Sequence, residues 1–291
     1  MIREFINNII PAFIRRRYRA AQQKKLKEHV RSLPKLSYEK LEEILRDELG
    51  LKTGDNVFVH SSMDRLNLDF PFYQALSVLR TIVGDEGTLI FPTYPELTSY
   101  KFLKAGHIFD INKTPSYTGI LSEFARRQKK AVRSLHPTKS VAAIGPAADE
   151  ITTSHHLSPY PYDFNSPYYK ICEMGAKIIG IGVMTTYLSA VHSIDDTLKE
   201  RFPVNPYHPE LFNAECVDTA GNTVIVKTYA HNMKKMNFDL PKYFADINDK
   251  ICRDIDIEGM KFFSADAGAM YKEMRRLAEN GITIYSKKYK K

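Results

Sequence analysis

The sequence predicts an α/β protein in which helices cover both faces of a sheet. A helix over Ser37–Gly50 is followed by a strand at Asn56–His60, a helix at Phe72–Val83 and a strand at Thr88–Pro92. This alternation is typical of a sheet that lies between helices. The apolar, glycine-punctuated segment Ala176–Val183 adds a further buried strand.

Local signals delimit the first elements. Ser37 is a capping-type serine followed by acidic residues, and Gly50 ends the apolar face of that helix. Gly54-Asp55 turns the chain into the first strand. The run Gly84–Gly87 ends the second helix before the next strand begins.

Long loops separate short elements in the middle of the chain. Residues 93–116 form a loop rich in Tyr, Pro and Lys, Gly119–Gln128 a helix, and Ser140–Gly145 a strand. Residues 152–170 form an irregular loop, and loops of that length are usually functional or disordered. Four of its side chains are pocket candidates, although a surface position is favoured for the two histidines: His155, His156, Tyr160 and Tyr162.

The last third of the chain predicts a hairpin, a helix and a strand. Leu211–Asp218 and Thr223–Tyr229 flank a turn, so the sheet is expected to be mixed. Ala265–Glu279 is predicted as the last helix and Gly281–Tyr285 as the last strand.

Charge and cysteine content narrow the function. The chain of 291 residues has a net charge of +8, but the first 35 residues hold ten Lys/Arg against two acids, and the last six add four lysines. The body is therefore mildly acidic, which argues against a nucleic-acid substrate. The three cysteines lack CxxC pairing, so neither a disulfide framework nor a zinc site is expected. Cys216 is predicted to be a buried thiol.

Residues 1–35 are predicted to be a basic amphipathic extension, and residues 36–291 the catalytic domain. The extension has neither the length of a transmembrane helix nor the order of a signal peptide. Two positions for it stay open: an interfacial helix on an anionic inner leaflet, or a helix docked on the body or on a partner subunit. A cytoplasmic protein, in contact with the membrane or not, is expected. The apolar stripe comprises Phe5, Ile6, Ile9, Ile10, Phe13 and Ile14.

The run Ser189–Asp196 carries the strongest catalytic signal. It follows the predicted strand at 176–183, and open α/β sheets place their chemistry where a strand gives way to a helix. In a helix that starts near Thr186, His192 and Asp195 share one face. A carboxylate beside an imidazole fixes its tautomer and makes it a better proton acceptor, as a general base requires.

Six phrases, in this order and spacing, resemble the antibiotic N-acetyltransferase family typified by aminoglycoside 3-N-acetyltransferases. They cover roughly residues 38–285: Val59–Met63, Gly87–Thr93, Thr114–Gly119, Arg133–Gly145, Ser166-Pro167 and the His192 run. The resemblance implies a three-layer α/β/α fold with a mixed, mostly parallel central sheet, distinct from GNAT acetyltransferases. It also implies acetyl transfer from acetyl-CoA to an amine, without a metal.

The resemblance assigns roles to particular residues. The family's catalytic histidine corresponds to His192, its acidic residue, usually Glu, to Asp195, and its threonine to Ser189. Because Asp195 is shorter than the family's Glu, either Asp195 or Asp196 could be the group that orients the base. The residues expected to bind the CoA arm are His60, Ser61, Ser62, Thr93, Ser116, Gly119, His136, Pro137, Thr138, Ser140 and Val141.

The acceptor is expected to be the amine of an amino sugar. The dispersed acids of the body and the basic extension favour surface-polysaccharide synthesis, with antibiotic acetylation as the alternative. Candidate rings for stacking on sugars are Tyr94, Tyr100, Phe102, Tyr160 and Tyr162. The sequence leaves two other functional hypotheses open: a catalytically inactive membrane-associated scaffold and a Ser-His-Asp hydrolase. It also leaves a homodimer open. A covalent acyl-enzyme is not expected, because no G-x-S-x-G elbow is present.

Overall fold

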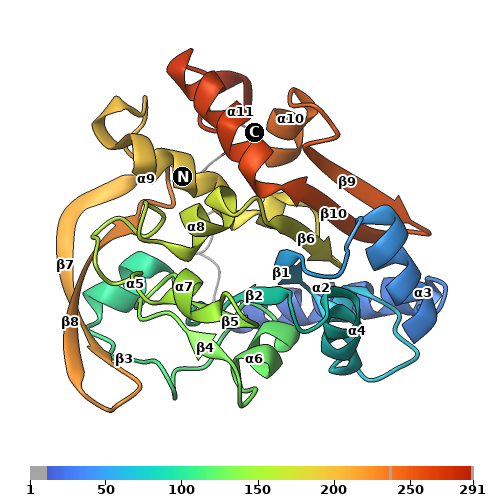
Figure 1. The fold of residues 1–291 in the computed structure, drawn as a ribbon. Helices are drawn as coiled ribbons and strands as arrows, with labels where there is room; N and C mark the ends of the chain where they lie inside the picture. Colours follow the sequence, from blue (N-terminus) through green and yellow to red (C-terminus); the bar gives the residue numbers. More distant parts are fainter. Residues whose placement is uncertain (1–11, 236–237, 290–291) are drawn as a thin grey trace.

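The computed structural model describes residues 12–235 and 238–289, which form a seven-stranded sheet and a three-stranded sheet (Figure 1). The order of the larger sheet is β4-β5-β2-β1-β6-β10-β9. Its strands are β1 (Asn56–Ser61), β2 (Thr88–Pro92), β4 (Val132–Arg133), β5 (Val141–Ile144), β6 (Lys177–Ile181), β9 (Cys252–Ile257) and β10 (Met260–Asp266). The smaller sheet has the order β3-β7-β8, from β3 (Phe109–Asp110), β7 (Tyr207–Val217) and β8 (Thr223–His231).

Within the larger sheet, parallel pairing is confined to the centre. There β1 pairs in parallel with β2 and with β6, while β5, β4, β10 and β9 join antiparallel. In the smaller sheet, β3 pairs in parallel with β7. The mixed sheet is confirmed, but it is less parallel than the resemblance implied. The predicted hairpin is present as β7 and β8, although it belongs to the second sheet and is not what makes the first sheet mixed.

Helices cover both faces of the larger sheet, as the three-layer expectation requires. Helices α3 (Tyr38–Glu43), α4 (Gln74–Val83) and α6 (Ile120–Arg126) lie on one face, and α7 (Ala148–Thr152), α8 (Pro167–Glu173), α10 (Leu240–Ala245) and α11 (Ala267–Glu279) on the other (Figure 1). Alternate side chains of β1 supply the two cores, because successive residues of a strand point to opposite faces. Val57 and Val59 pack towards α4, whereas Phe58 packs towards α8.

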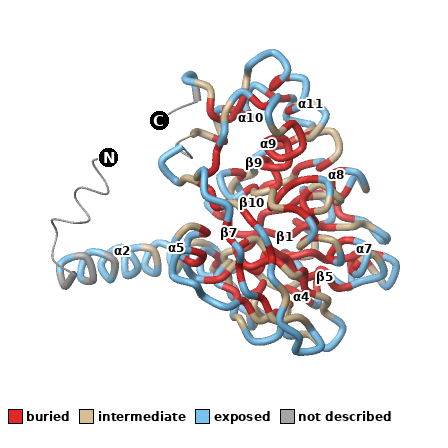
Figure 2. Tube along the Cα trace, turned by 90° about the vertical axis from the view of Figure 1, so that its left-hand side faces the viewer, coloured by how far each residue is buried: buried red, intermediate tan, exposed pale blue. Residues whose placement is uncertain are grey.

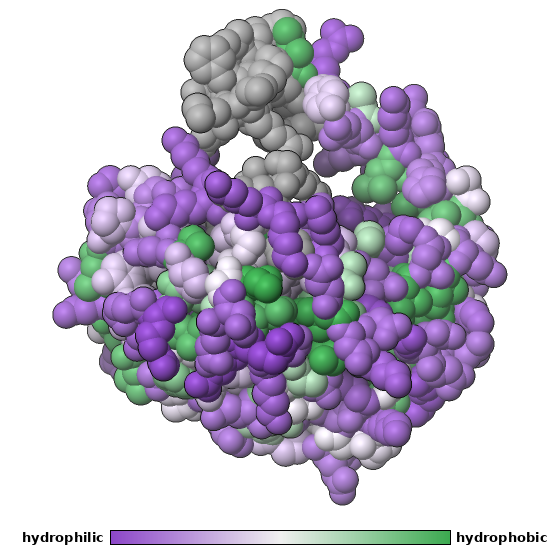
Figure 3. Space-filling model, turned by 90° about the horizontal axis from the view of Figure 1, so that it is seen from above, coloured by the Kyte–Doolittle hydropathy of each residue, from purple (hydrophilic) through white to green (hydrophobic). Residues whose placement is uncertain are grey.

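The second sheet has a core of its own. Helix α5 (Ser99–Lys104) packs on β8, and Phe102, Phe109, Cys216 and Val226 are buried between them. The segment 93–116 was predicted to be an unbroken loop and instead contains α5 and β3. Figure 3 shows the molecule from above, where the surface is mostly hydrophilic.

Several predicted elements differ from the observed ones. Ser37 caps α3 by accepting a hydrogen bond from the Lys40 amide, but the helix continues as the π-helix η1 (Ile44–Glu48) before Gly50. The predicted strand at 281–285 is wrong, since those residues form turns. The hairpin of β9 and β10 was not predicted; its turn holds Glu258 at φ 52° and Gly259 at φ 87°.

Helix α2 (Ala12–Ser32) extends from the body as an exposed arm (Figure 2). Ile14 and Tyr18, one turn apart on α2, are 44% and 64% exposed. Phe5, Ile6, Ile9 and Ile10 of the predicted stripe lie outside the described residues. In the part of the chain that the structure describes, no helix has both the length and the apolar character needed to cross a bilayer.

Candidate active site

The His192 run begins where β6 ends. Gly182 turns the chain at φ 73°, and a Cβ there would lie 2.4 Å from the carbonyl oxygen of Ser62. The run then continues through η3 (Thr185–Tyr187), η4 (Ser189–His192) and α9 (Ser193–Leu198). The sequence predicted one helix from about Thr186, whereas two 3-10 turns precede the α-helix.

The predicted pairing of His192 with Asp195 is confirmed by the distances. His192 Nδ1 lies 2.9 Å from Asp195 Oδ2, and both residues are buried. Nε2 of His192 makes no hydrogen bond to any described residue. The carboxylate thus holds one ring nitrogen and leaves the other able to accept a proton.

Tyr285 is a third member of this group that the sequence analysis missed. Its hydroxyl donates to Asp195 Oδ2 at 2.7 Å and lies 3.2 Å from His192 Nδ1. Burial raises the pKa of Asp195, while the hydrogen bonds from His192 and Tyr285 oppose that rise. Tyr285 is 90 residues from Asp195 in the chain, so no local pattern could have indicated the contact.

Asp196 has a different role from Asp195. Its carboxylate accepts hydrogen bonds from the Tyr207 hydroxyl at 2.6 and 2.7 Å and from the Tyr162 amide at 2.8 Å. Burial raises the pKa of Asp196 well above its ordinary value, and the Tyr207 hydrogen bond opposes this. The geometry therefore assigns the orientation of His192 to Asp195, and Asp196 joins α9 to the loop at Tyr162 and to β7.

A first cavity, of about 430 Å³, opens at the carboxyl ends of the three parallel strands β1, β2 and β6. Ligands of open α/β sheets bind at this edge. Ser189 contributes to the lining, as do four residues predicted to bind the cofactor, and the full lining comprises His60, Ser61, Ser62, Pro92, Tyr94, Tyr117, Thr118, Gly119, Val183, Tyr187 and Ser189.

Three buried polar groups of this cavity wall lack partners among the described residues. They are Nε2 of His60, Oγ of Ser61 and Oγ of Ser189. His60 packs between Phe58 and Phe263, with ring centroids 5.0 and 5.9 Å away. Burial lowers the pKa of His60 to about 3, so its ring is neutral near pH 7. These groups suit an amide or hydroxyl of a ligand rather than a phosphate.

The remaining predicted cofactor residues do not line the first cavity. The hydroxyls of Thr93 and Ser140 lie 3.1 Å apart, and Arg133 Nε donates to both, at 3.2 and 3.0 Å. Ser116 Oγ lies 2.8 Å from Thr118 Oγ1. Pro137, Thr138 and Val141 are buried and do not line the first cavity.

His136 and His155 are internal residues. Their rings stack with centroids 4.4 Å apart. His136 Nδ1 accepts from the amides of Thr138 and Lys139, at 3.3 and 3.0 Å. The surface position favoured for His155 is wrong: it is 1% exposed and lies 2.9 Å from Ser134 Oγ. His156 is half-buried.

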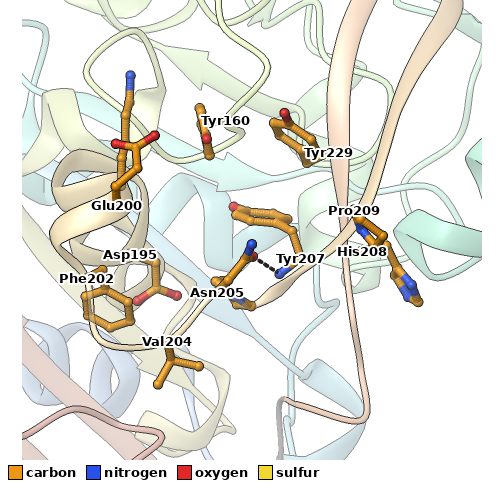
Figure 4. A pocket seen from close by; sticks show the side chains of 12 residues that line it. Tyr160, Asp195, Glu200, Phe202, Val204, Asn205, Tyr207, His208, Pro209 and Tyr229 are labelled. Carbon is orange, nitrogen blue, oxygen red and sulfur yellow. Dashed lines mark hydrogen bonds between the residues drawn. The ribbon is translucent and has the colours of Figure 1, made fainter.

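A second cavity, of about 410 Å³, has Asp195 of the His192–Asp195 pair in its wall (Figure 4). Asp195 forms part of its wall together with the rings of Tyr160, Tyr207 and Tyr229. The ring centroid of Tyr160 is 6.0 Å from that of Tyr207 and 5.2 Å from that of Tyr229. Figure 4 shows these three rings close to one another, with the Asp195 carboxylate below Tyr160.

The five predicted sugar-stacking rings are distributed over the molecule. Tyr160 lines the second cavity, and Tyr94 lines the first. Tyr162 is buried, with its ring 5.2 Å from that of His192. Tyr100 stacks on His208 at 4.1 Å, and Phe102 belongs to the core of the second sheet.

None of the three cysteines is placed as a nucleophile. All are buried, and burial raises the pKa of Cys172 and of Cys216 to about 12. Burial also raises the pKa of the Cys252 thiol. A thiol of such high pKa is not ionised near neutral pH. Among the described residues, no group of three His, Cys, Asp or Glu side chains could hold a metal ion.

We expect the buried histidines to make the fold sensitive to acid. Burial lowers the pKa of His155 from 6.5 to about 3, so the unfolded chain takes up a proton there that the folded chain refuses. This part of the stability is complete above pH 6.5 and is lost as the pH falls below it, by about 2 kcal/mol at pH 5. His155→Gln should remove that part of the pH dependence, measured by urea unfolding at pH 7.5 and 5.

Comparing the pH dependence of the native chain with that of the variant separates the contribution of His155 from the opposite contribution of buried carboxyls. Burial raises the pKa of Asp163, Asp195 and Asp196, and raised carboxyl pKa values stabilise the fold as the pH falls. Those carboxyls are present in the native chain and in the variants, so their contribution cancels when the pH dependences are compared. The exposed His107→Gln is the matched control, and equal pH dependence in all three proteins would contradict the prediction.

The fold and the site together define an α/β/α protein with a buried histidine–aspartate pair close to two cavities. The family model described as aminoglycoside 3-N-acetyltransferase matches residues 58–279. The chain belongs to the aminoglycoside 3-N-acetyltransferase family.

Curated relatives carry the same family name. Aminoglycoside N(3)-acetyltransferase VII of Streptomyces paromomycinus is 30% identical over 188 residues, 58% of this chain and 64% of that protein. Aminoglycoside N(3)-acetyltransferase IX of Micromonospora chalcea is 28% identical over 188 residues, 58% of this chain and 66% of that protein. The match thus spans just under two thirds of these relatives.

Solved structures share the fold at low identity. The structure of AAC-IIIb in binary complex with CoASH has a TM-score of 0.68 at 22% identity, and the match covers 86% of this chain and 98% of AAC-IIIb. Aminoglycoside acetyltransferase AAC(3)-Xa has a TM-score of 0.72 at 18% identity, covering 91% and 99%. The expected fold, distinct from GNAT acetyltransferases, is confirmed.

Proposed function

We propose that this chain transfers the acetyl group of acetyl-CoA to an amine of an aminoglycoside. The observation that carries the proposal is the position of the His192–Asp195 pair: Ser189, three residues before His192, lines the first cavity, and Asp195 lines the second. The donor would occupy the first cavity and the acceptor the second, so that the reacting groups meet at His192.

The first cavity suits the pantetheine arm of acetyl-CoA. Three buried polar groups in its wall, on His60, Ser61 and Ser189, have no partner among the described residues, and polar groups of the arm would satisfy them. Gly119 brings its backbone close, since a Cβ there would lie 2.8 Å from the Ser61 carbonyl oxygen. A fold neighbour, AAC-IIIb, was solved with CoASH, which supports this choice of donor.

The pair of His192 and Asp195 would then act as a general base. His192 Nε2 takes a proton from the acceptor amine, whose nitrogen attacks the thioester carbon. The negative charge formed on the thioester oxygen collapses, the C–S bond breaks, and the sulfur takes the proton from His192. Asp195 and the Tyr285 hydroxyl keep Nδ1 in place throughout.

The relatives favour the antibiotic alternative over surface-polysaccharide synthesis, because those matched are aminoglycoside N(3)-acetyltransferases. One fold neighbour, AAC-VIa, was solved bound to sisomicin. The three tyrosine rings of the second cavity would pack on sugar faces. The division into an extension (1–35) and a catalytic domain (36–291) stays a proposal, supported by the exposure of α2.

An acceptor screen tests the proposed function. We expect the purified chain to release free thiol from acetyl-CoA with sisomicin or gentamicin, and mass spectrometry to find one added acetyl group. Turnover only with nucleotide-linked amino sugars would instead support polysaccharide synthesis. Thiol release without any acceptor would indicate a hydrolase, and no release with any amine would favour the scaffold.

A further inference from the structure

Lys139 has a backbone fixed on two sides. Its amide donates to His136 Nδ1 at 3.0 Å, and its carbonyl oxygen accepts from the Tyr168 hydroxyl at 3.0 Å. Tyr168 itself donates to the Tyr94 hydroxyl at 2.6 Å. These contacts fix where the lysine side chain starts, and the cluster of tyrosines around it limits where the side chain can go.

The ammonium group of Lys139 lies over two of these rings. Nζ is 4.6 Å from the ring centroid of Tyr94 and 5.9 Å from that of Tyr162. Burial lowers the pKa of Lys139 to about 8, so the group is still mostly protonated at pH 7. No described residue forms an ion pair or hydrogen bond with Nζ. Lys139 is half-buried, and a cation withdrawn from water commonly has an anionic partner, so this one is suited to an anion that arrives with a substrate.

The two rings connect Lys139 to both parts of the site. Tyr94 lines the first cavity together with Ser189, while the Tyr162 ring is 5.2 Å from that of His192. The ring of His231 is also close to that of His192, with 5.0 Å between the centroids. The buried Nε2 of His231 has no partner among the described residues. The ammonium therefore lies near the junction of the donor cavity and the base.

We propose that the Lys139 ammonium is a catalytic group that binds the oxygen of the donor thioester and stabilises the negative charge formed there. This rests on the proposed acetyl transfer. When the amine nitrogen bonds to the thioester carbon, the π electron pair of the carbonyl moves to the oxygen beside Nζ, and His192 takes the amine proton. When the C–S bond breaks, that pair re-forms the carbonyl, and the sulfur leaves with the proton from His192.

The side of the site on which Lys139 lies favours the donor over the acceptor as its ligand. Lys139 itself lies in the wall of neither cavity, but its nearest ring, Tyr94, lines the first cavity and not the second. A cation would also repel a polycationic acceptor, whereas it attracts a developing oxyanion. Recognition of an anionic group on the acceptor is the competing explanation.

Steady-state kinetics of Lys139→Met and Lys139→Arg separate these explanations. For Lys139→Met we expect kcat to fall about 10²–10³-fold with every acceptor, as for loss of one oxyanion donor, while the KM for acetyl-CoA changes little. Lys139→Arg should recover part of kcat. An unchanged kcat in Lys139→Met, or a rise in KM confined to acceptors that carry an anion, would overturn the proposal.

A binding measurement tests the same site without turnover. S-carboxymethyl-CoA carries an anion near the position of the thioester oxygen, and S-acetonyl-CoA is its neutral counterpart. By calorimetry we expect the native chain to prefer the anionic analogue about tenfold at pH 7, and Lys139→Met to show no preference. The preference should decline in the native chain above about pH 8 but not in Lys139→Arg.

The two measurements distinguish the two proposals. A native chain that acetylates amines but binds both analogues equally would refute the role of Lys139 alone. A native chain that prefers the anionic analogue but acetylates no amine would refute the proposed function and leave the anion site standing. Equal melting temperatures of the native and variant chains exclude a folding defect.

Discussion

Replacement of His192 by Ala is expected to lower kcat by about 10²–10⁴-fold, the range for loss of a positioned general base. The acceptor amine is protonated in solution and gives up one proton to water before it reacts. Its nitrogen gives up a second proton on attack, and His192 Nε2 is the group that the geometry supplies to take that proton. The KM for acetyl-CoA should change little, because the first cavity is formed by other residues. Initial rates of thiol release with a saturating aminoglycoside measure the effect.

Two further variants test how the base is held. Asp195→Asn keeps the shape but removes the charge beside Nδ1, so it should lower kcat less than His192→Ala does. Tyr285→Phe removes one hydrogen bond to Asp195 and should have the smallest effect of the three.

The exposed His107→Ala is the control for loss of a histidine and should keep native kinetics. If His192→Ala retained the native rate, another group would have to be the base, and the proposed role of the pair would be wrong. Melting temperatures show whether a loss of rate reflects unfolding.

The parts of the fold that the sequence predicted are those with strong local signals. The apolar runs of β1, β2 and β6 and the capped helix at Ser37 were located within a few residues. The strands β9 and β10 were missed because Arg253, Asp254 and Asp256 make β9 more polar than a buried strand. Their Glu258-Gly259 turn also lacks the Asn-Gly or Asp-Gly pair that marks most hairpins.

The site was predictable only where its parts are neighbours in the chain. The His192–Asp195 contact joins residues three apart, and the pattern showed it. The contact of Tyr285 with Asp195 and the approach of Lys139 to Tyr94 join segments that only the folded chain brings together. The sequence also did not reveal which loop residues are buried. His155 lies in a loop of mostly polar residues, yet its side chain is buried against His136.

A large loss of stability is expected when Arg133 is replaced. This residue lies in the segment Arg133–Gly145 that resembles the family, but the sequence alone assigned it no role. The residue is 7% exposed, and its guanidinium makes five hydrogen bonds. The acceptors are the hydroxyls of Thr93 and Ser140 and the carbonyl oxygens of Ile111, Thr114 and Thr93. One side chain thus joins the end of β2, the loop after it and the segment before β5.

Burial lowers the pKa of Arg133 to about 9, but the group stays charged near pH 7. Its charge is also stabilised by the Phe109 ring, whose centroid lies 4.7 Å from Cζ. Removal of the guanidinium would leave several buried oxygens without donors, each at a cost of about 1–3 kcal/mol. A domain is stable by only about 5–15 kcal/mol, so this loss is a large share of the total.

We therefore expect Arg133→Met to lose at least about 3 kcal/mol of unfolding free energy and to melt about 10 °C lower. The stability of Arg133→Lys should lie between that of the native chain and that of Arg133→Met, because an ammonium can satisfy only some of the five acceptors. The control is Arg46→Met, which removes an exposed helix pair with Glu42 and should change the melting temperature little. Equal melting of the Arg133 and Arg46 variants would show that the buried guanidinium does not hold these segments together.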